Sequence, residues 1–533
     1  MSELKYYSAL LSAGKISRRE FMGRAAALGA TTALATSMAS AAVKAAGPKS
    51  GGSYKQALTG GGTGDSLDPA QILDSFMINV SFGQLRNNLT EISPEGELIG
   101  ELAESWEASG DAATWTFTLR QGVEFHNGKT MDANDVVASF QHHMGEDSKS
   151  AAKGIISPVE DVKADGDKVV FTLVGGNADF PFLVSDYHLG ICPAKDDGSI
   201  DWESGVGTGG YALESFEPGI LTVVKKNPNY WKEGRAHFDS VENLFIADAS
   251  ARTNALKTGE IQSMSNLDLK TINLLQRDES LQIFPITGNK HCTLPMFTDT
   301  APFDNNDVRL ALKYAIDRDE WHKKIIKEQG EVANDIPVGP ANIYRATTDE
   351  IPQRPYDPDK AKYHLKQAGM ENLSVDLHLA DTAFEGAVDA GQLYAEAAKK
   401  AGIDIKIIRE PNDGYWSNVW LVKPWVGSYW GGRPTEDWIF SQIYSANAEW
   451  NEAKWNNARF NELLIEARSE LDPIKRRELY VEMQRLVHDD GGSIIPLFMA
   501  YTHAATKDIA LPEVMANNWE LDGHKNAERW SMA

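Results

Sequence analysis

Cysteine is almost absent from this chain: Cys192 and Cys292 are its only two among 533 residues. No CxxC pair occurs, so neither a thiolate zinc site nor a redox dithiol is expected. The two cysteines could pair in an oxidising compartment, and the sequence leaves that pairing open. A chain of this length does not need a disulfide to be stable.

Positive charge is also scarce. Lysine and arginine number 52 against 76 aspartates and glutamates, which gives a net charge of -24. Nucleic acids and anionic lipids bind basic surfaces, so neither is expected as a partner. The composition, 42% hydrophobic and 24% charged, is typical of soluble globular proteins. The length exceeds what one hydrophobic core supports, so two or three lobes are expected.

The usual catalytic and metal-binding motifs are missing, since the sequence has neither GxSxG nor HExxH. His142 and His143 point about 100° apart on a helix and do not face one ion, so we assign them, with His126, surface or capping roles. No metal and no cofactor is predicted. Glu436 and Asp437 are the nearest approach to a hydrolase's carboxylate pair, but sequence neighbours face apart. A secreted enzyme is therefore the least favoured class.

One glycine-rich segment matches a nucleotide-binding motif, and the residues that follow it decide whether the match is meaningful. Residues 205–210 match GxGxxG literally. A dinucleotide site requires a helix after this motif, whereas the strand-like segment 211–216 follows it. We therefore predict a turn followed by a strand.

The longest uncharged run lies at the N-terminus. Ser17-Arg18-Arg19-Glu20-Phe21-Met22 precedes an Ala-rich stretch from Ala25 to Val43, with small residues at 39–41. This order of regions is that of an export signal, and the paired arginines resemble the twin-arginine type. A membrane anchor is less favoured because the run contains Ala, Thr, Ser and Gly rather than Leu or Ile. We expect a mature protein that begins between Ala42 and Gly47, outside the cytoplasm.

Half of the fourteen tryptophans lie between Tyr415 and Trp455. Glycines and a proline interrupt this stretch, which favours a rigid aromatic wall around a small-molecule cavity. For each single ring, a place in the core is the alternative. We predict that the cluster forms the floor of a binding cleft. Its members are Trp416, Trp420, Trp425, Trp430, Trp438, Trp450 and Trp455.

Hydrophobic periodicity predicts a mixed α/β chain. The alternation in 114–119 marks a half-buried strand, and Asp132 or Asn134 caps the helix that follows. In the second half, one helical face runs along 304–327, and Gly369 ends a helix that begins at Pro358. A strand, helix, strand unit over 375–408 predicts a parallel pair. Further helices are expected over 460–471 and 473–488, and a strand over 493–498.

Several segments resemble the dipeptide, oligopeptide and nickel class of extracellular solute-binding proteins (family 5), the substrate-binding components of ABC transporters. They occur in the family's order and span almost the whole mature chain. They are AESW at 103–106, TWTFTLRQGVEFHNGK, KKNPNYW, APFDNNDVRLALKYAIDR, DPDKAKYHLKQAG and ARSELDPIKRRELYVEMQRLVHDDGGSIIPLF.

The resemblance implies an α/β fold like that of periplasmic binding proteins (type II, cluster C), with two large lobes, a hinge and an inserted small α+β lobe. Residues 1–45 form the signal peptide. Lobe I comprises 46–88, 195–286 and 502–533, the small lobe 89–194, and lobe II 287–501. It also implies a periplasmic monomer that closes on a small solute and delivers it to ABC permease subunits in the inner membrane, with no bond made or broken.

In peptide-binding members of this family, an Asp in the segment matching 429–438 holds the peptide's amino group. Aligned on Pro434, that Asp falls at Trp430, which is not acidic, and Asp437 is the first candidate to replace it. The ligand is a peptide or amino-acid-derived solute, or alternatively an opine, a metal chelate or haem. We expect Arg433 to pair with a ligand carboxylate and Trp416 and Trp430 to stack on it. The predicted ligand-binding residues are Trp430, Arg433, Asp437, Tyr429, Trp416, His291 near the hinge, and Leu58 on the lobe I side.

Overall fold

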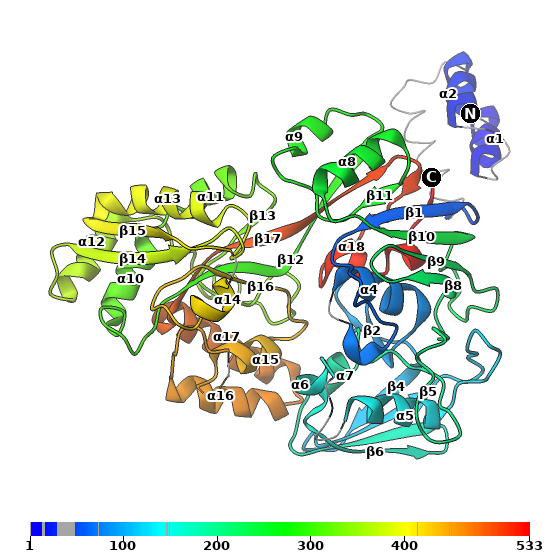
Figure 1. Ribbon diagram of the computed structural model, residues 1–533, viewed down its shortest axis with the longest axis horizontal. Coiled ribbons are helices and arrows are strands. Elements are labelled where there is room, and N and C mark those ends of the chain that lie inside the picture. The colour runs from blue at the N-terminus through cyan, green and yellow to red at the C-terminus, as the bar shows by residue number, and fades with distance from the viewer. Residues whose placement is uncertain are drawn as a thin grey trace.

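The computed structural model describes residues 2–12, 16, 18–28, 48–72, 74–144, 148, 150–412, 414–446, 448 and 450–533 (Figure 1). Helices α1 (Ser2–Ser12) and α2 (Arg18–Ala27) precede the main body. Ser17, most of the Ala-rich run and the expected processing site at 42–47 lie outside the described residues. None of the helices in the described ranges is both long enough and apolar enough to span a bilayer.

A nine-stranded mixed sheet runs from lobe I into lobe II, with β1 near its centre. Its path runs β16-β12-β17-β11-β1-β10-β9-β8, and β13 pairs with β17. β1 is parallel to both of its neighbours, β10 and β11. The GxGxxG segment leads into the β8–β9 hairpin, so the predicted turn and strand are confirmed. The lobe I elements are β1 (Ser53–Leu58), η1 (Pro69–Gln71), α4 (Ser75–Val80), η2 (Ser81–Leu85), β8 (Tyr211–Glu217), β9 (Leu221–Lys226), β10 (Ser240–Phe245), α8 (Ala249–Thr258), β11 (Ser263–Met264), α9 (Ile272–Leu275), β18 (Ile509–Ala510), α18 (Glu520–Gly523), α19 (Asn526–Arg529) and β19 (Ser531–Met532).

The small lobe packs a helix on a four-stranded antiparallel sheet of order β4-β5-β7-β6. β5 buries every second residue, as the sequence alternation predicts. Asp132 caps α5 in a full capping box. Its elements are β2 (Thr90–Ile92), β3 (Leu98–Gly100), β4 (Ala103–Ala108), β5 (Thr114–Leu119), α5 (Ala133–His143), α6 (Lys153–Ile156), β6 (Val159–Asp165), β7 (Lys168–Leu173) and α7 (Phe180–Leu183).

Lobe II contains the predicted parallel unit, β14 (Leu373–Leu379), α13 (Ala387–Ala398) and β15 (Ile403–Arg409). The single helical run expected over 304–327 is wrong. It divides into α10 (Asn306–Ala315) and α11 (Arg318–Lys324), because the Asp317 side chain accepts from Glu320 N and Ile316 is extended. The remaining elements are β13 (Gly330–Val332), α12 (Pro358–Gln367), η3 (Lys399–Ala401), α14 (Tyr415–Asn418), β16 (Ser428–Trp430), α15 (Glu436–Ile439), η4 (Phe440–Tyr444), α16 (Ala458–Ser469) and α17 (Pro473–Asp490).

Two long strands join lobes I and II. β12 (Leu281–Pro295) and β17 (Ser493–Thr506) pair antiparallel from Leu281↔Thr506 to Pro295↔Ser493 and cross between the two halves (Figure 1). The expected lobe boundaries, 286/287 and 501/502, both fall inside these strands. The segment expected to act as the hinge is therefore a hydrogen-bonded ribbon rather than a loose linker. Cys292 lies on β12, and both it and Cys192 are buried free thiols.

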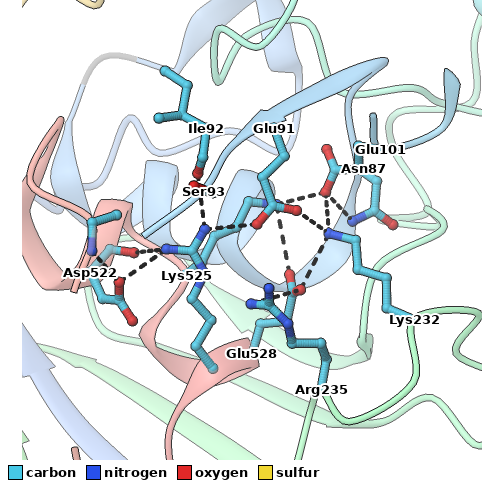
Figure 2. A network of polar contacts seen from close by, with 12 residues as sticks. Asn87, Glu91, Ile92, Ser93, Glu101, Lys232, Arg235, Asp522, Lys525 and Glu528 are labelled. Carbon is cyan, nitrogen blue, oxygen red and sulfur yellow. Dashed lines mark hydrogen bonds and ion pairs between the residues drawn. The ribbon is translucent and has the colours of Figure 1, made fainter. Parts of the chain in front are cut away.

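A buried network of charges ties the C-terminal segment to lobe I and to the start of the small lobe (Figure 2). Lys525 Nζ lies 2.8 Å from Glu101 Oε1, and both side chains are at most 1% exposed. Lys232 reaches Glu91 and Glu101 at 2.5 Å. Arg529 bonds Glu91 at 2.7 Å. Burial alone would raise the pKa of Glu91, but the charges of Lys232, Lys525 and Arg529 outweigh it and hold that pKa well below its ordinary range.

Removal of one cation from this network is expected to destabilise the fold. Lys525→Met leaves buried carboxylates short of a partner, so we expect a loss of about 3 to 5 kcal/mol at pH 7 in urea unfolding followed by tryptophan fluorescence. Because a lowered carboxylate pKa gives stability that is lost as pH falls below about 4.3, the penalty should shrink in acid.

Lys399→Met is the matched control. Lys399 pairs with Glu396, and both side chains are exposed. Its loss should cost less than about 1 kcal/mol. Equal losses in the two variants would show that the network does not stabilise the fold.

Candidate functional site

A cavity of about 650 Å³ lies where the three lobes meet. Lobe II supplies the loop after β16 and two tryptophans, the small lobe supplies the segment after α7, and lobe I supplies α4 and the C-terminal segment. Its lining includes Ser75, Asp186, Tyr187, His188, Gly432, Arg433, Trp438, Gln442, Trp450, Tyr501, Trp519, Glu520 and His524.

A second cavity, of about 760 Å³, lies between lobe II and the segment of lobe I that precedes α9, at Leu269 and Lys270. Lysines and acids alternate around it, including Lys270, Lys290, Lys324, Asp381 and Glu385. Its charges are mixed and its aromatic side chains are few. The first cavity is lined by several aromatic side chains and by Arg433 and Glu520, two side chains of opposite charge that form no ion pair with any described residue. It is therefore a better site for a small organic solute than the second cavity.

The tryptophan cluster does not form one wall. Trp438 and Trp450 line the first cavity, joined by Trp519 from lobe I. Trp430 is 6% exposed and lies behind Trp450, with ring centroids 5.8 Å apart. The core contains Trp425 and Trp455. Aromatic residues of one stretch thus divide between core and cavity.

Arg433 lies on the lobe II side of the cavity. Its Nε donates to Gln442 Oε1 at 2.7 Å, and its guanidinium lies 5.8 Å from the Trp430 ring and 5.7 Å from the Trp438 ring. The Asn289 and Asn342 amides donate to its carbonyl oxygen at 3.0 and 3.1 Å and fix the loop. Among the described residues no carboxylate forms an ion pair with Arg433. Burial lowers its pKa, so a ligand anion would meet a poorly solvated cation.

Asp437 has a partner within lobe II. Its Oδ1 accepts from Arg468 Nε at 3.0 Å and from Ser441 Oγ at 3.2 Å, and it does not line the cavity. Its neighbour Glu436 accepts from Tyr344 N at 2.7 Å, and burial raises the pKa of Glu436 to about 7. The one-turn helix α15 therefore turns both acids into lobe II and leaves Arg433 as the charge at this wall.

The other predicted site residues lie outside the first cavity. Tyr429 lines the second cavity, and Trp416 packs edge-on against it at 5.8 Å. His291 is buried, and its Nδ1 donates to Asn289 O at 2.8 Å. Leu58 is in the lobe I core. Of the seven predicted residues, only Arg433 borders the first cavity, and all seven ligand roles stay predictions.

The three histidines that raised the question of a metal site have separate partners. His126 bonds Gly209 O, His142 bonds Asp68 and His143 bonds Ser150. The part of the chain that the structure describes contains no cluster of three His, Cys, Asp or Glu side chains suited to a metal ion.

Sequence reasoning missed the residues that lobe I and the small lobe bring to the cavity. Tyr187, Trp519, Glu520 and His524 lie in segments without hydrophobic periodicity or a motif. The sequence predicted only that the tail packs on lobe I. No local signal could have placed these residues at the cavity, because their position depends on contacts with distant strands.

Comparison with known proteins agrees with this architecture. Residues 97–452 match the model of bacterial extracellular solute-binding proteins, family 5 Middle. The dipeptide-binding protein of Escherichia coli is 28% identical over 478 residues, which is 81% of this chain and 87% of that protein. The periplasmic binding protein DppA from Helicobacter pylori, solved with the peptide STSA, has a TM-score of 0.71 at 24% identity and covers 91% of this chain and 98% of its own. HbpA2 from Haemophilus parasuis has a TM-score of 0.79 at 21% identity, covering 90% of this chain and 100% of its own.

The chain therefore belongs to the family 5 bacterial extracellular solute-binding proteins. Its fold is that of the type II periplasmic binding proteins. It binds a small solute as the substrate-binding component of an ABC importer, which confirms the class predicted from the sequence.

The raised pKa of Glu436, a buried acid behind the cavity wall, leads to a prediction about the stability of the fold. Between its ordinary value, about 4.5, and about 7, the folded state keeps a proton that the unfolded chain releases, so the ionised form opposes folding as pH rises. Glu436→Gln should therefore gain about 2 to 3 kcal/mol relative to the unchanged protein between pH 5 and pH 8, measured by urea unfolding.

Glu462→Gln on the surface of α16 is its control, since that side chain is 71% exposed. It should follow the unchanged protein at every pH. Parallel pH curves for Glu436→Gln and the unchanged protein would mean that Glu436 ionises normally in the folded state.

Proposed function

We propose that this protein captures a small solute with a carboxylate, peptide or amino-acid-derived, in the cavity between lobes I and II, and delivers it to ABC permease subunits in the inner membrane. The observation that carries the proposal is Arg433. Its guanidinium borders the cavity, is oriented by Gln442, and has no carboxylate partner among the described residues. A ligand carboxylate would supply that partner through two parallel hydrogen bonds.

Aromatic walls support an organic solute. Trp438, Trp450 and Trp519 offer flat apolar faces beside the polar groups, the usual composition of a small-molecule site. Opines fit the same description because they too carry carboxylates. A metal chelate is less well supported: both ring nitrogens of His188 already have oxygen partners, Asp186 at 2.6 Å and Ile72 O at 2.8 Å.

We also propose that the protein binds without turnover and acts as a monomer. The carboxylates at the cavity are Asp186, paired with His188, and Glu520 on the opposite segment, and no nucleophile with a general base accompanies them in the described lining. A bound solute should be recovered unchanged by mass spectrometry after prolonged incubation. The release of product would favour the hydrolase alternative.

Arg433→Ala is the direct test. In a thermal-shift screen of di- and tripeptides, opines, amino-acid derivatives, sugars and nickel chelates, acidic solutes should stabilise the unchanged protein by about 2.7 kcal/mol at a hundredfold excess over Kd. The variant should bind those solutes 10- to 100-fold more weakly, because a hydrogen bond to a charged group contributes about 1.5 to 3 kcal/mol. The Tm of the ligand-free variant should change little.

Arg345→Ala is the matched control, because Arg345 pairs with Glu331 away from the first cavity. It should leave affinity unchanged. Binding of acidic solutes that survives Arg433→Ala intact would assign Arg433 a structural role.

We further propose that the N-terminal segment directs export by the twin-arginine route. The paired arginines at 18 and 19, followed by a weakly apolar run, support it. With Arg18→Lys and Arg19→Lys combined, the precursor should accumulate unprocessed in the cytoplasm, as seen by fractionation and immunoblotting. Mass spectrometry of the exported protein should find an N-terminus between Ala42 and Gly47. Normal export of the double variant would exclude this route.

A further inference from the structure

Glu520 is an isolated buried acid at the lobe I wall of the cavity. Its side chain is 4% exposed and borders the cavity, and Oε2 has no hydrogen-bond partner among the described residues. No described basic side chain forms an ion pair with it. Burial raises the pKa of Glu520, while hydrogen bonds from the Ser75 and Asn266 side chains and the charges of Lys290 and Arg252 act against that rise. A buried carboxylate with a free oxygen and no opposite charge in contact is costly, so a fold that retains one at a cavity suggests an occupant that pairs with it.

The backbone that presents Glu520 is strained. Leu521, Asp522 and His524 have φ values of 50°, 58° and 61°, and Gly523 between them has φ 65°, so the turn is left-handed. Residues with a Cβ rarely adopt this conformation, because the Cβ then lies too close to the following carbonyl oxygen. Strain of this kind persists only where the surroundings hold it, and it is concentrated at functional sites.

The buried charge network of Figure 2 supplies that hold. Asp522 Oδ1 accepts from Arg529 Nη1 at 3.0 Å and from Ala516 N at 2.7 Å, and its Oδ2 accepts from Trp530 Nε1 at 3.2 Å. On the other side of the turn, Leu521 N donates to His503 Nε2 at 3.1 Å. Lys525, one residue beyond the turn, is fixed to Glu101. Glu520 is therefore presented by a rigid segment of lobe I.

The remaining ionisable groups at the cavity are neutral or paired. His188 Nδ1 lies 2.6 Å from Asp186 Oδ1, so that acid already has a partner. Burial lowers the pKa of His524 to about 3, which leaves its ring uncharged. Glu520 and Arg433 are then the two charges without an opposite charge in contact. Tyr501 lies near both: after burial, the charge of Glu520 raises and that of Arg433 lowers the pKa of its hydroxyl.

We infer that Glu520 binds the cationic group of the solute while Arg433 binds its carboxylate, so that the cavity selects zwitterions. This rests on the proposed function of the cavity and names its ligand class. The anchor comes from lobe I, whereas Asp437, the acid favoured from the sequence, is held by Arg468. A solute with both charges joins the two lobes, and a solute with one charge binds a single wall.

The test uses peptides in three charge forms on the full-length exported protein. The probes are Ala-Phe and Ala-Ala-Phe with free termini, the same peptides N-acetylated, and the same peptides C-amidated, measured by calorimetry. Free forms should bind at least tenfold more tightly than either blocked form. In Glu520→Gln the free form should fall to the affinity of the N-acetylated form, whose own affinity should not fall.

The Tm of the ligand-free protein distinguishes a misfolded variant from one that has lost only a ligand contact. Glu520→Gln preserves the shape of the side chain and removes a buried charge, so the ligand-free Tm should stay the same or rise while affinity falls. Glu436→Gln, which neutralises a buried acid outside the cavity, should keep the preference for free termini.

Three outcomes would overturn the inference and leave the proposed function standing. They are equal binding of N-acetylated and free forms, unchanged binding by Glu520→Gln, and binding of acidic solutes only when those solutes lack a cationic group. Failure of every free peptide, opine and amino-acid derivative to bind at millimolar concentration would overturn the proposed function itself, and the inference with it.

Discussion

The charged cluster formed by Glu91, Glu101, Lys232, Lys525 and Arg529 is the contact on which the cavity's geometry depends. Charges so deeply buried are tolerated only when each has an opposite partner at short distance. That requirement fixes three distant parts of the chain against one another: the start of the small lobe, the loop after β9 and the C-terminal segment. The left-handed turn at 521–524 is stable because this cluster is on one side of it and the hinge strand β17 on the other.

A protein that binds and releases a solute between rigid lobes needs a flexible connection between them, and β12 and β17 are the strands expected to provide it. β12 and β17 run as one paired ribbon through both lobes, and paired strands of this kind are one of the usual connections about which lobes close on a ligand. Closure is favoured only by the amount by which the solute binds the closed arrangement better than the open one. Because Arg433 and Glu520 lie on opposite lobes, a solute with both charges binds the closed arrangement much better than the open one. A solute with only one of the two charges gains little from closure. Selectivity and closure are then two results of the same pair of contacts.

The fold was predictable from the sequence to the extent that its signals are local. Alternation identified β5, a proline and a glycine bounded α12, and the order of several motifs identified the family. The break between α10 and α11 was missed because Ile316 continues the apolar face, and only the cap at Asp317 reveals the interruption.

The site was harder to predict because its residues depend on distant contacts. Arg433 borders the cavity, but Asp437, four residues later, faces Arg468 because α15 turns it there. Aromatic side chains fill cores and line cavities equally well, so the tryptophan stretch could not be divided from sequence. Glu520 had no signal at all: a left-handed turn of non-glycine residues is set by its surroundings, not by local preference.

The order of strands in the large sheet bears on how the protein folds. β1 pairs with β10 and β11, which follow the small lobe in the chain, and β11 pairs with β17, which follows lobe II. Most strands of lobe I precede lobe II in the chain, but β11 finds its second partner only in β17, so the sheet is complete only after lobe II has been made. Sheets assembled from such remote strands form slowly. The cavity wall that contains Trp519, Glu520 and His524 follows β17, so it consists of the last residues of the chain to be synthesised.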